Sequence, residues 1–144
     1  MTRFGFPARI RRDGKAYGVR FRDIPECLTF GADRQAAEVA AGDALAEAVA
    51  GRISGNIGLP EPSALRRGEV IVELPASMAA KAALYLALEN AKISKAELAR
   101  RLGVDEREVR RMLDPRHGTR LATLDAALSV LGKRLTLDLR DAAD

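Results

Sequence analysis

Basic side chains gather in one stretch near the C-terminal end of the sequence, from Lys92 to Arg120. Nine Lys and Arg residues fall there against five Asp and Glu residues, so this stretch has a net charge of +4. The whole chain of 144 residues also carries +4, so the rest of it sums to zero. A basic cluster on a neutral chain favours contact with the phosphates of nucleic acid, although a solvated face of mixed charge is the alternative.

Several side chains in this stretch have the chemistry to read or hold DNA. We expect Arg107 and Arg110 to read bases, because a guanidinium can donate two hydrogen bonds to guanine. Glu106 could accept a hydrogen bond from cytosine, or it could instead complement the dipole of its helix. The other DNA-binding candidates are Arg111 and the expected phosphate contacts Ser94, Lys95, Arg116, His117 and Arg120.

Two short helices joined by Gly103-Val104 would position these side chains. Ser94 and Glu97 predict a capping box at the first helix, in which each side chain bonds the other's backbone amide, and Asp105 predicts a cap on the second. The small Ala99 lets the second helix cross closely, and the side chains expected between the two helices are Leu98, Leu102, Val104, Val109, Met112 and Leu113. This is the sequence form of a helix-turn-helix, whose second helix enters the major groove, and an ordinary helical hairpin is the alternative.

The segments on either side of this pair complete a predicted helical domain over residues 76–144. We expect a helix capped by Ser77 before the pair and a helix over Leu121–Leu131, stopped by Gly132, after it. Alternating leucines then predict a short final strand over Arg134–Arg140. That strand is a candidate for pairing between subunits, and packing within its own subunit is the alternative.

The first 75 residues predict a small α/β layer. Apolar residues that alternate with others indicate three strands, and an alanine-rich stripe at helical spacing indicates a helix. The expected elements are strands over 4–10, 17–21 and 28–30, a helix over Arg34–Ile53 capped by Asp33, a loop over Ser54–Arg67 and a strand over Glu69–Leu74. The predicted order is β-β-β-α-β, so the fold class is α+β with domains at 1–75 and 76–144.

Composition excludes several classes of protein. A single Cys and a single His exclude a disulfide framework, a multi-Cys zinc site and a His-rich centre. The sequence contains no apolar run of about 18 residues, so we expect no membrane span and a cytoplasmic protein.

No cofactor and no enzymatic activity are expected either. A two-metal nuclease needs clustered carboxylates, whereas Asp13 and Asp33 have turn and capping roles. Cys27 is expected to be a small buried hydrophobe, and His117 a loop or phosphate contact rather than a catalyst.

The chain resembles the HicB antitoxins of bacterial toxin–antitoxin pairs over nearly its full length. The resembling segments are Phe21–Gly31, Asp33 and its Ala-rich helix, Leu59–Ser63, Lys81–Tyr85, Ser94–Leu113, Asp114–His117, Leu124 and Gly132–Leu135. Glu26 stands where the family usually has Gly, so the local turn is expected to differ.

This resemblance implies a partial ribonuclease-H-like domain in front of a helix-turn-helix domain that also dimerises. It implies that the chain blocks a HicA-type toxin, a small basic protein that cleaves mRNA with a His, and represses its own operon at operator DNA. The expected toxin contacts are Asp23, Glu26, Glu38 and Glu47. The alternative is a stand-alone transcription regulator whose front domain senses a ligand or a protein.

Overall fold

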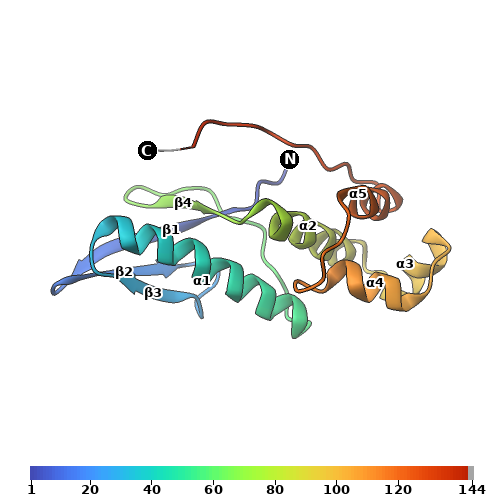
Figure 1. The fold of residues 1–144 in the computed structure, drawn as a ribbon, viewed down its shortest axis with the longest axis horizontal. Helices are drawn as coiled ribbons and strands as arrows, with labels where there is room; N and C mark the ends of the chain where they lie inside the picture. The colour runs from blue at the N-terminus through green and yellow to red at the C-terminus, as the bar shows by residue number, and fades with distance from the viewer. Residues whose placement is uncertain (143–144) are drawn as a thin grey trace.

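The computed structural model describes residues 1–142, and these form a sheet at one end and a group of helices at the other (Figure 1). The chain order is β1 (Gly5–Asp13), β2 (Ala16–Phe21), β3 (Leu28–Gly31), α1 (Arg34–Ser54), β4 (Val70–Glu73), α2 (Ala76–Ala91), α3 (Lys95–Leu102), α4 (Glu106–Leu113) and α5 (Leu121–Val130). The predicted β-β-β-α-β order and the α+β class are confirmed. No helix within the described residues is both long and apolar enough to cross a membrane.

The four strands form one antiparallel sheet in the order β3-β2-β1-β4. A tight hairpin joins β1 to β2, and Gly14 at its tip adopts a φ of 62°, which glycine reaches without a side-chain penalty. β4 returns from the far end of α1 and pairs with the first half of β1, where Phe6 lies opposite Val72. All four strands of the sheet are therefore in place before the chain enters its helical half.

α1 covers one face of this sheet with small side chains. Its buried stripe includes Ala37, Ala41 and Leu45, which lie at helical spacing. The helix comes very close to the end of β3, because a Cβ on Gly31 would lie 2.2 Å from the backbone nitrogen of Ala37. Asp33 caps the helix as predicted by accepting a hydrogen bond of 2.8 Å from the Ala36 amide.

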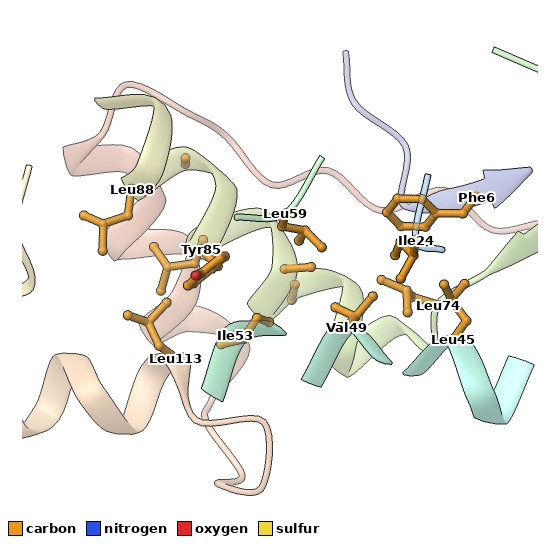
Figure 2. Packing of buried hydrophobic residues seen from close by; sticks show 14 of the residues in the cluster. Phe6, Ile24, Leu45, Val49, Ile53, Leu59, Leu74, Tyr85, Leu88 and Leu113 are labelled. Carbon is orange, nitrogen blue, oxygen red and sulfur yellow. The ribbon is translucent and has the colours of Figure 1, made fainter. Parts of the chain in front are cut away.

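The apolar core continues without a break from the sheet into the helical half (Figure 2). The last buried residues of α1, Val49 and Ile53, belong to the same cluster as Tyr85 and Leu88 of α2. The Tyr85 hydroxyl also donates a hydrogen bond of 2.8 Å to the carbonyl of Ile57, in the loop that follows α1. α2 in turn packs against α4 and α5, so it is the central helix of the C-terminal half.

Two sequence predictions about the C-terminal half are wrong. Residues Arg134–Arg140 form no strand, and Leu137 and Leu139 are 77% and 98% exposed. A single segment with alternating leucines has no neighbouring strand to bond within this chain, so its pattern is not enough to make a ladder. α2 begins at Ala76 with Pro75 at its N-cap position and without a side-chain cap, so the predicted Ser77 cap is wrong, because Ser77 already lies inside the first turn.

The contact between β3 and α1 leads to a stability prediction. Gly31→Ala should lower the free energy of unfolding by about 3 kcal/mol, because the new methyl group overlaps the backbone of α1. Gly42→Ala is the control, since a Cβ there meets nothing within 4 Å, and it should stabilise the helix by roughly 1 kcal/mol. Urea unfolding of both variants measures this, and equal effects would contradict the close packing.

Candidate functional site

Helices α3 and α4 are defined by the side chains that cap them. Ser94 Oγ accepts a hydrogen bond of 3.0 Å from the Glu97 amide, and Asp105 accepts one of 2.8 Å from the Arg107 amide. Gly103 ends α3 in the left-handed conformation, with a φ of 69°. Both predicted caps and the predicted turn residue are therefore confirmed.

The Glu97 side chain does not complete the predicted capping box. Its carboxylate accepts hydrogen bonds of 2.6 Å from Arg100 and 3.0 Å from Arg101. These two guanidinium groups lower the pKa of Glu97 to about 2. A charged donor makes a stronger hydrogen bond than a backbone amide, so the carboxylate faces along its own helix instead of reaching back to the cap.

α4 has one buried side and one charged side. Val109, Met112 and Leu113 are buried, whereas the three arginines of the helix are exposed. Val104, in the turn before α4, is 39% exposed, so its predicted place between the helices is wrong. It follows directly on Gly103, in the exposed turn between α3 and α4.

Two of the three α4 arginines are held by carboxylates on their own helix. Arg110 bonds Glu106 at 3.0 Å, and Arg111 bonds Glu108. Arg107 has no carboxylate within salt-bridge distance among residues 1–142. The helix therefore presents Arg107 as a free cation, while Arg110 and Glu106 form a paired unit.

The other nucleic-acid candidates lie at two separate places. Arg111, His117 and Arg120 line one hollow of about 220 Å³ beside the end of α4. Arg116 is exposed in the same loop, between α4 and α5. Ser94 and Lys95 lie instead at the start of α3, where the Lys95 ammonium donates a hydrogen bond of 3.2 Å to Asn56, just beyond α1.

Lys81 of α2 is a buried cation that supports this region and that sequence reasoning did not assign to it. Its side chain is 4% exposed, and its ammonium donates to the carbonyls of Arg111 (3.1 Å) and Met112 (3.0 Å) and to Thr119 Oγ1 (2.9 Å). It thus donates to carbonyls in the last turn of α4, where the Arg111 carbonyl also accepts a hydrogen bond of 3.2 Å from the Asp114 amide. Burial lowers the pKa of Lys81. The available signal was a lone lysine in an apolar, alanine-rich helix.

The two partner-binding candidates between β2 and β3 are occupied by contacts within the chain. The Asp23 carboxylate, with a side chain only 8% exposed, accepts from the Ser63 amide (2.8 Å) and hydroxyl (2.6 Å). Glu26 receives two hydrogen bonds, of 2.6 and 2.8 Å, from Arg52 in the last turn of α1. That guanidinium lowers the pKa of Glu26. Both carboxylates therefore hold loops of their own domain in place.

The two partner-binding candidates on α1 are exposed. Glu38 makes only a 3.5 Å pair with Arg34 on the same helix, and Glu47 lies more than two turns further along. Asp43 is exposed between them. Two of the four candidate carboxylates are therefore engaged in hydrogen bonds within the chain, and the other two remain available on α1.

Cys27 is buried as predicted, with 3% of its surface exposed. Burial raises the pKa of its thiol to about 11. Elsewhere in the part of the chain that the structure describes, no three His, Cys, Asp or Glu side chains gather as metal ligands.

Lys81 leads to a prediction about stability and its pH dependence. Lys81→Met should lower the free energy of unfolding by about 1–3 kcal/mol at neutral pH, because acceptors at the end of α4 lose their donor. Since the folded-state pKa lies below the ordinary 10.5, the unfolded chain binds more protons just below that pH. The wild type should therefore gain stability relative to Lys81→Met as the pH rises through this range.

Urea titrations at several pH values measure both effects, with Lys15→Met as the control at an exposed lysine of the β1–β2 turn. Equal stability of Lys81→Met and the wild type at every pH would show that the buried ammonium does not hold α4.

Comparison with known proteins identifies the family of this chain. Residues 5–83 match the family described as the HicB-like antitoxin of bacterial toxin–antitoxin systems. The sequence is 39% identical over 132 residues to Antitoxin HicB 2 of Photorhabdus laumondii, covering 92% of this chain and 94% of that protein. It is 38% identical over 121 residues to Antitoxin HicB of Escherichia coli K12, covering 84% and 88%. Antitoxin HicB of Pseudomonas fluorescens is 30% identical over 140 residues, covering 96% of both chains.

The resemblance stated from the sequence is confirmed by these matches. They extend over the sheet half and, in the curated relatives, over the helical half as well. The chain therefore belongs to the HicB family of antitoxins of bacterial toxin–antitoxin systems.

Proposed function

We propose that this antitoxin neutralises a HicA-type, mRNA-cleaving toxin with its sheet half and represses its own operon by binding operator DNA with α3 and α4. The observation that carries the DNA-reading role is the two-sided α4. A short capped helix that buries one side and presents a free Arg107 on the other is suited to entering the major groove. In this proposal α3 and α4 form a helix-turn-helix, and α4 is its recognition helix.

Each charged group around α4 has a role in this proposal. Arg107 reads a guanine, since it is free to donate two hydrogen bonds without breaking an ion pair. Arg110 and Glu106 must first release each other before they contact bases, so they contribute less. Phosphates are held at the start of α3 by Ser94 and Lys95, and beyond α4 by Arg111, Arg116, His117 and Arg120.

Operator binding requires two recognition helices about 34 Å apart, and hence a dimer. The C-terminal half supplies a candidate contact in Arg134–Arg140, where Leu137 and Leu139 face solvent in one chain, while Leu135 packs against the core and Arg140 pairs with Glu73 of β4. Pairing of this segment with its copy in a second subunit would give its backbone a ladder partner and cover those leucines. We propose that the C-terminal half carries the dimer contact.

Toxin neutralisation is assigned to the exposed face of α1 rather than to the turn after β2. Glu38 and Glu47 remain available there to attract a basic toxin, whereas Asp23 is bonded to Ser63 and Glu26 to Arg52. Binding would cover the toxin's catalytic face sterically, with no chemical step performed by the antitoxin. Its own cysteine thiol, with a raised pKa, stays protonated and buried.

DNA reading predicts different effects for two basic residues. Arg107→Ala should reduce the preference for operator over random DNA by about 1–3 kcal/mol, because one base contact is lost. Lys95→Ala should weaken binding to operator and to random DNA alike, and it should reduce the salt slope by about 1. Fluorescence anisotropy at several salt concentrations measures both, with Arg34→Ala of α1 as the control. Equal loss on operator and random DNA for Arg107→Ala would remove its base-reading role.

Toxin binding predicts a charge effect on α1. The double variant Glu38→Lys/Glu47→Lys should bind the neighbouring toxin about tenfold more weakly at low salt, and the deficit should shrink at high salt. Asp141→Lys makes half of that charge change in the C-terminal segment and should leave affinity unchanged. Co-purification and calorimetry with catalytically inactive toxin measure this. A well-folded double variant with wild-type affinity would place the toxin on another surface.

A further inference from the structure

The sheet face opposite α1 carries exposed arginine and apolar side chains that the proposed function leaves unused. α1 packs on the face that holds Phe6, Ala8 and Ile10, so the alternate residues of the strands face the other way. Over β2, β3 and the second half of β1, these residues are Arg9, Arg11, Gly18, Arg20, Leu28 and Phe30. Leu28 is 58% exposed and Phe30 is 73% exposed, so no described element covers this part of the sheet.

The strand register arranges these residues in two rows across the sheet. In one row, Arg9 lies directly opposite Arg20, which lies opposite Leu28. In the other row, Arg11 lies opposite Gly18, which lies opposite Phe30. The aromatic ring therefore shares its row with a cation across a position that has no side chain.

The pair of Arg9 and Arg20 costs stability in the free protein. Like charges directly opposite each other on antiparallel strands repel, because their Cβ atoms lie only about 5 Å apart. Among residues 1–142, no carboxylate lies within 4.0 Å of Arg9, Arg11 or Arg20 to offset this repulsion. Arg9 donates only one long hydrogen bond, of 3.4 Å, to the carbonyl of Arg67. Arg9 does act on the Glu69 carboxylate and helps to lower its pKa, but that carboxylate is bonded to Arg22. Three cations on one face, none of them in an ion pair with a described carboxylate, favour a ligand with several negative charges.

A hollow beside these rows is also lined by arginine and apolar side chains. It measures about 410 Å³, and four arginines, Arg9, Arg20, Arg22 and Arg66, contribute to its lining. Glu69 is the single acid in that lining, and it is already bonded to Arg22 at 2.9 Å. Leu28 and Pro25 supply an apolar wall. The hollow therefore combines excess positive charge with apolar surface, next to the exposed ring of Phe30.

We infer that this face, comprising Arg9, Arg11, Arg20 and Phe30, binds single-stranded RNA. Arginines at alternate positions of neighbouring strands hold successive phosphates, and the Phe30 ring stacks on an unpaired base. Gly18 leaves the approach open, since a Cβ there would meet nothing closer than the Arg11 carbonyl at 4.0 Å. Open sheets with exposed aromatic side chains bind single strands in this manner. A duplex would not satisfy the site, because its bases are already stacked on one another.

The inference is independent of the proposed function. It uses the sheet face opposite α1, whereas toxin binding is assigned to α1 and operator binding to α4. The two surfaces of the N-terminal half also differ in charge. α1 exposes Glu38, Asp43 and Glu47, while the open sheet face exposes arginines. A basic toxin and a polyanionic strand are therefore drawn to opposite sides of the same domain.

Fluorescence anisotropy of the full-length protein with a labelled oligouridine of about 12 nucleotides tests this inference. Phe30→Ala should weaken binding about tenfold. Arg11→Gln/Arg20→Gln should weaken it further and reduce the salt slope by about 1.4, as expected for two phosphates on a single strand. Arg34→Gln, an arginine of α1, and Arg107→Gln, an arginine of α4, should leave RNA binding unchanged.

Thermal unfolding separates binding from folding. Arg20→Gln removes one of two facing like charges, so its melting temperature should equal or exceed that of the wild type while its RNA affinity falls. A residue needed only for structure would show the opposite change in stability.

Several results would overturn the inference. These are no RNA binding by the wild type, unchanged binding by the sheet-face variants, and loss of binding in Arg107→Gln alone. Tighter binding of oligodeoxythymidine than of oligouridine would assign the face to single-stranded DNA instead. Loss of toxin co-purification in the sheet-face variants would assign it to a protein partner.

Discussion

The buried face of α1 packs on two neighbours in succession, and the arrangement of the two halves depends on this. Its 21 residues extend roughly 30 Å, and its last turns reach beyond the sheet to α2. Ala37, Ala41 and Leu45 pack on the sheet, while Val49 and Ile53 continue the same core toward α2. Tyr85 then bonds the loop after α1, so apolar packing and a hydrogen bond join the halves. Helices α3 and α4 are thereby held in a defined position relative to the sheet.

Charged groups are used inside this structure as well as on its surfaces. Asp23 holds Ser63, Glu26 holds Arg52, and the Lys81 ammonium holds the end of α4. Each of these contacts joins segments that are distant in sequence, which no local pattern reveals. A carboxylate is therefore not available to a partner protein when an amide or guanidinium from a distant part of the chain already donates hydrogen bonds to it, even if its neighbours in the sequence give no sign of this. This is why half of the expected toxin contacts have a structural role instead.

The elements that local chemistry controls were predicted well. The period of apolar residues located four strands and five helices, and Asp33, Ser94, Gly103 and Asp105 marked helix ends where the structure has them. Predictions failed where a competing partner, or the lack of a partner, decided the outcome. Two guanidinium groups took the Glu97 carboxylate from the cap, and the segment over residues 134–140 had no second strand to pair with.

The sequence by itself determined the family, the order of elements and the concentration of basic charge on the second half, because these depend on residue type and spacing along the chain. Tertiary structure decided which charges remain free. Among the residues that the structure describes, it left Arg107 without a carboxylate partner beside the paired Arg110, and it buried Lys81 beneath α4. It also divided a nearly neutral N-terminal half into an acidic helix face and a basic sheet face. That division arises because α1 covers only one side of the sheet, and alternate residues of each strand must point to opposite sides.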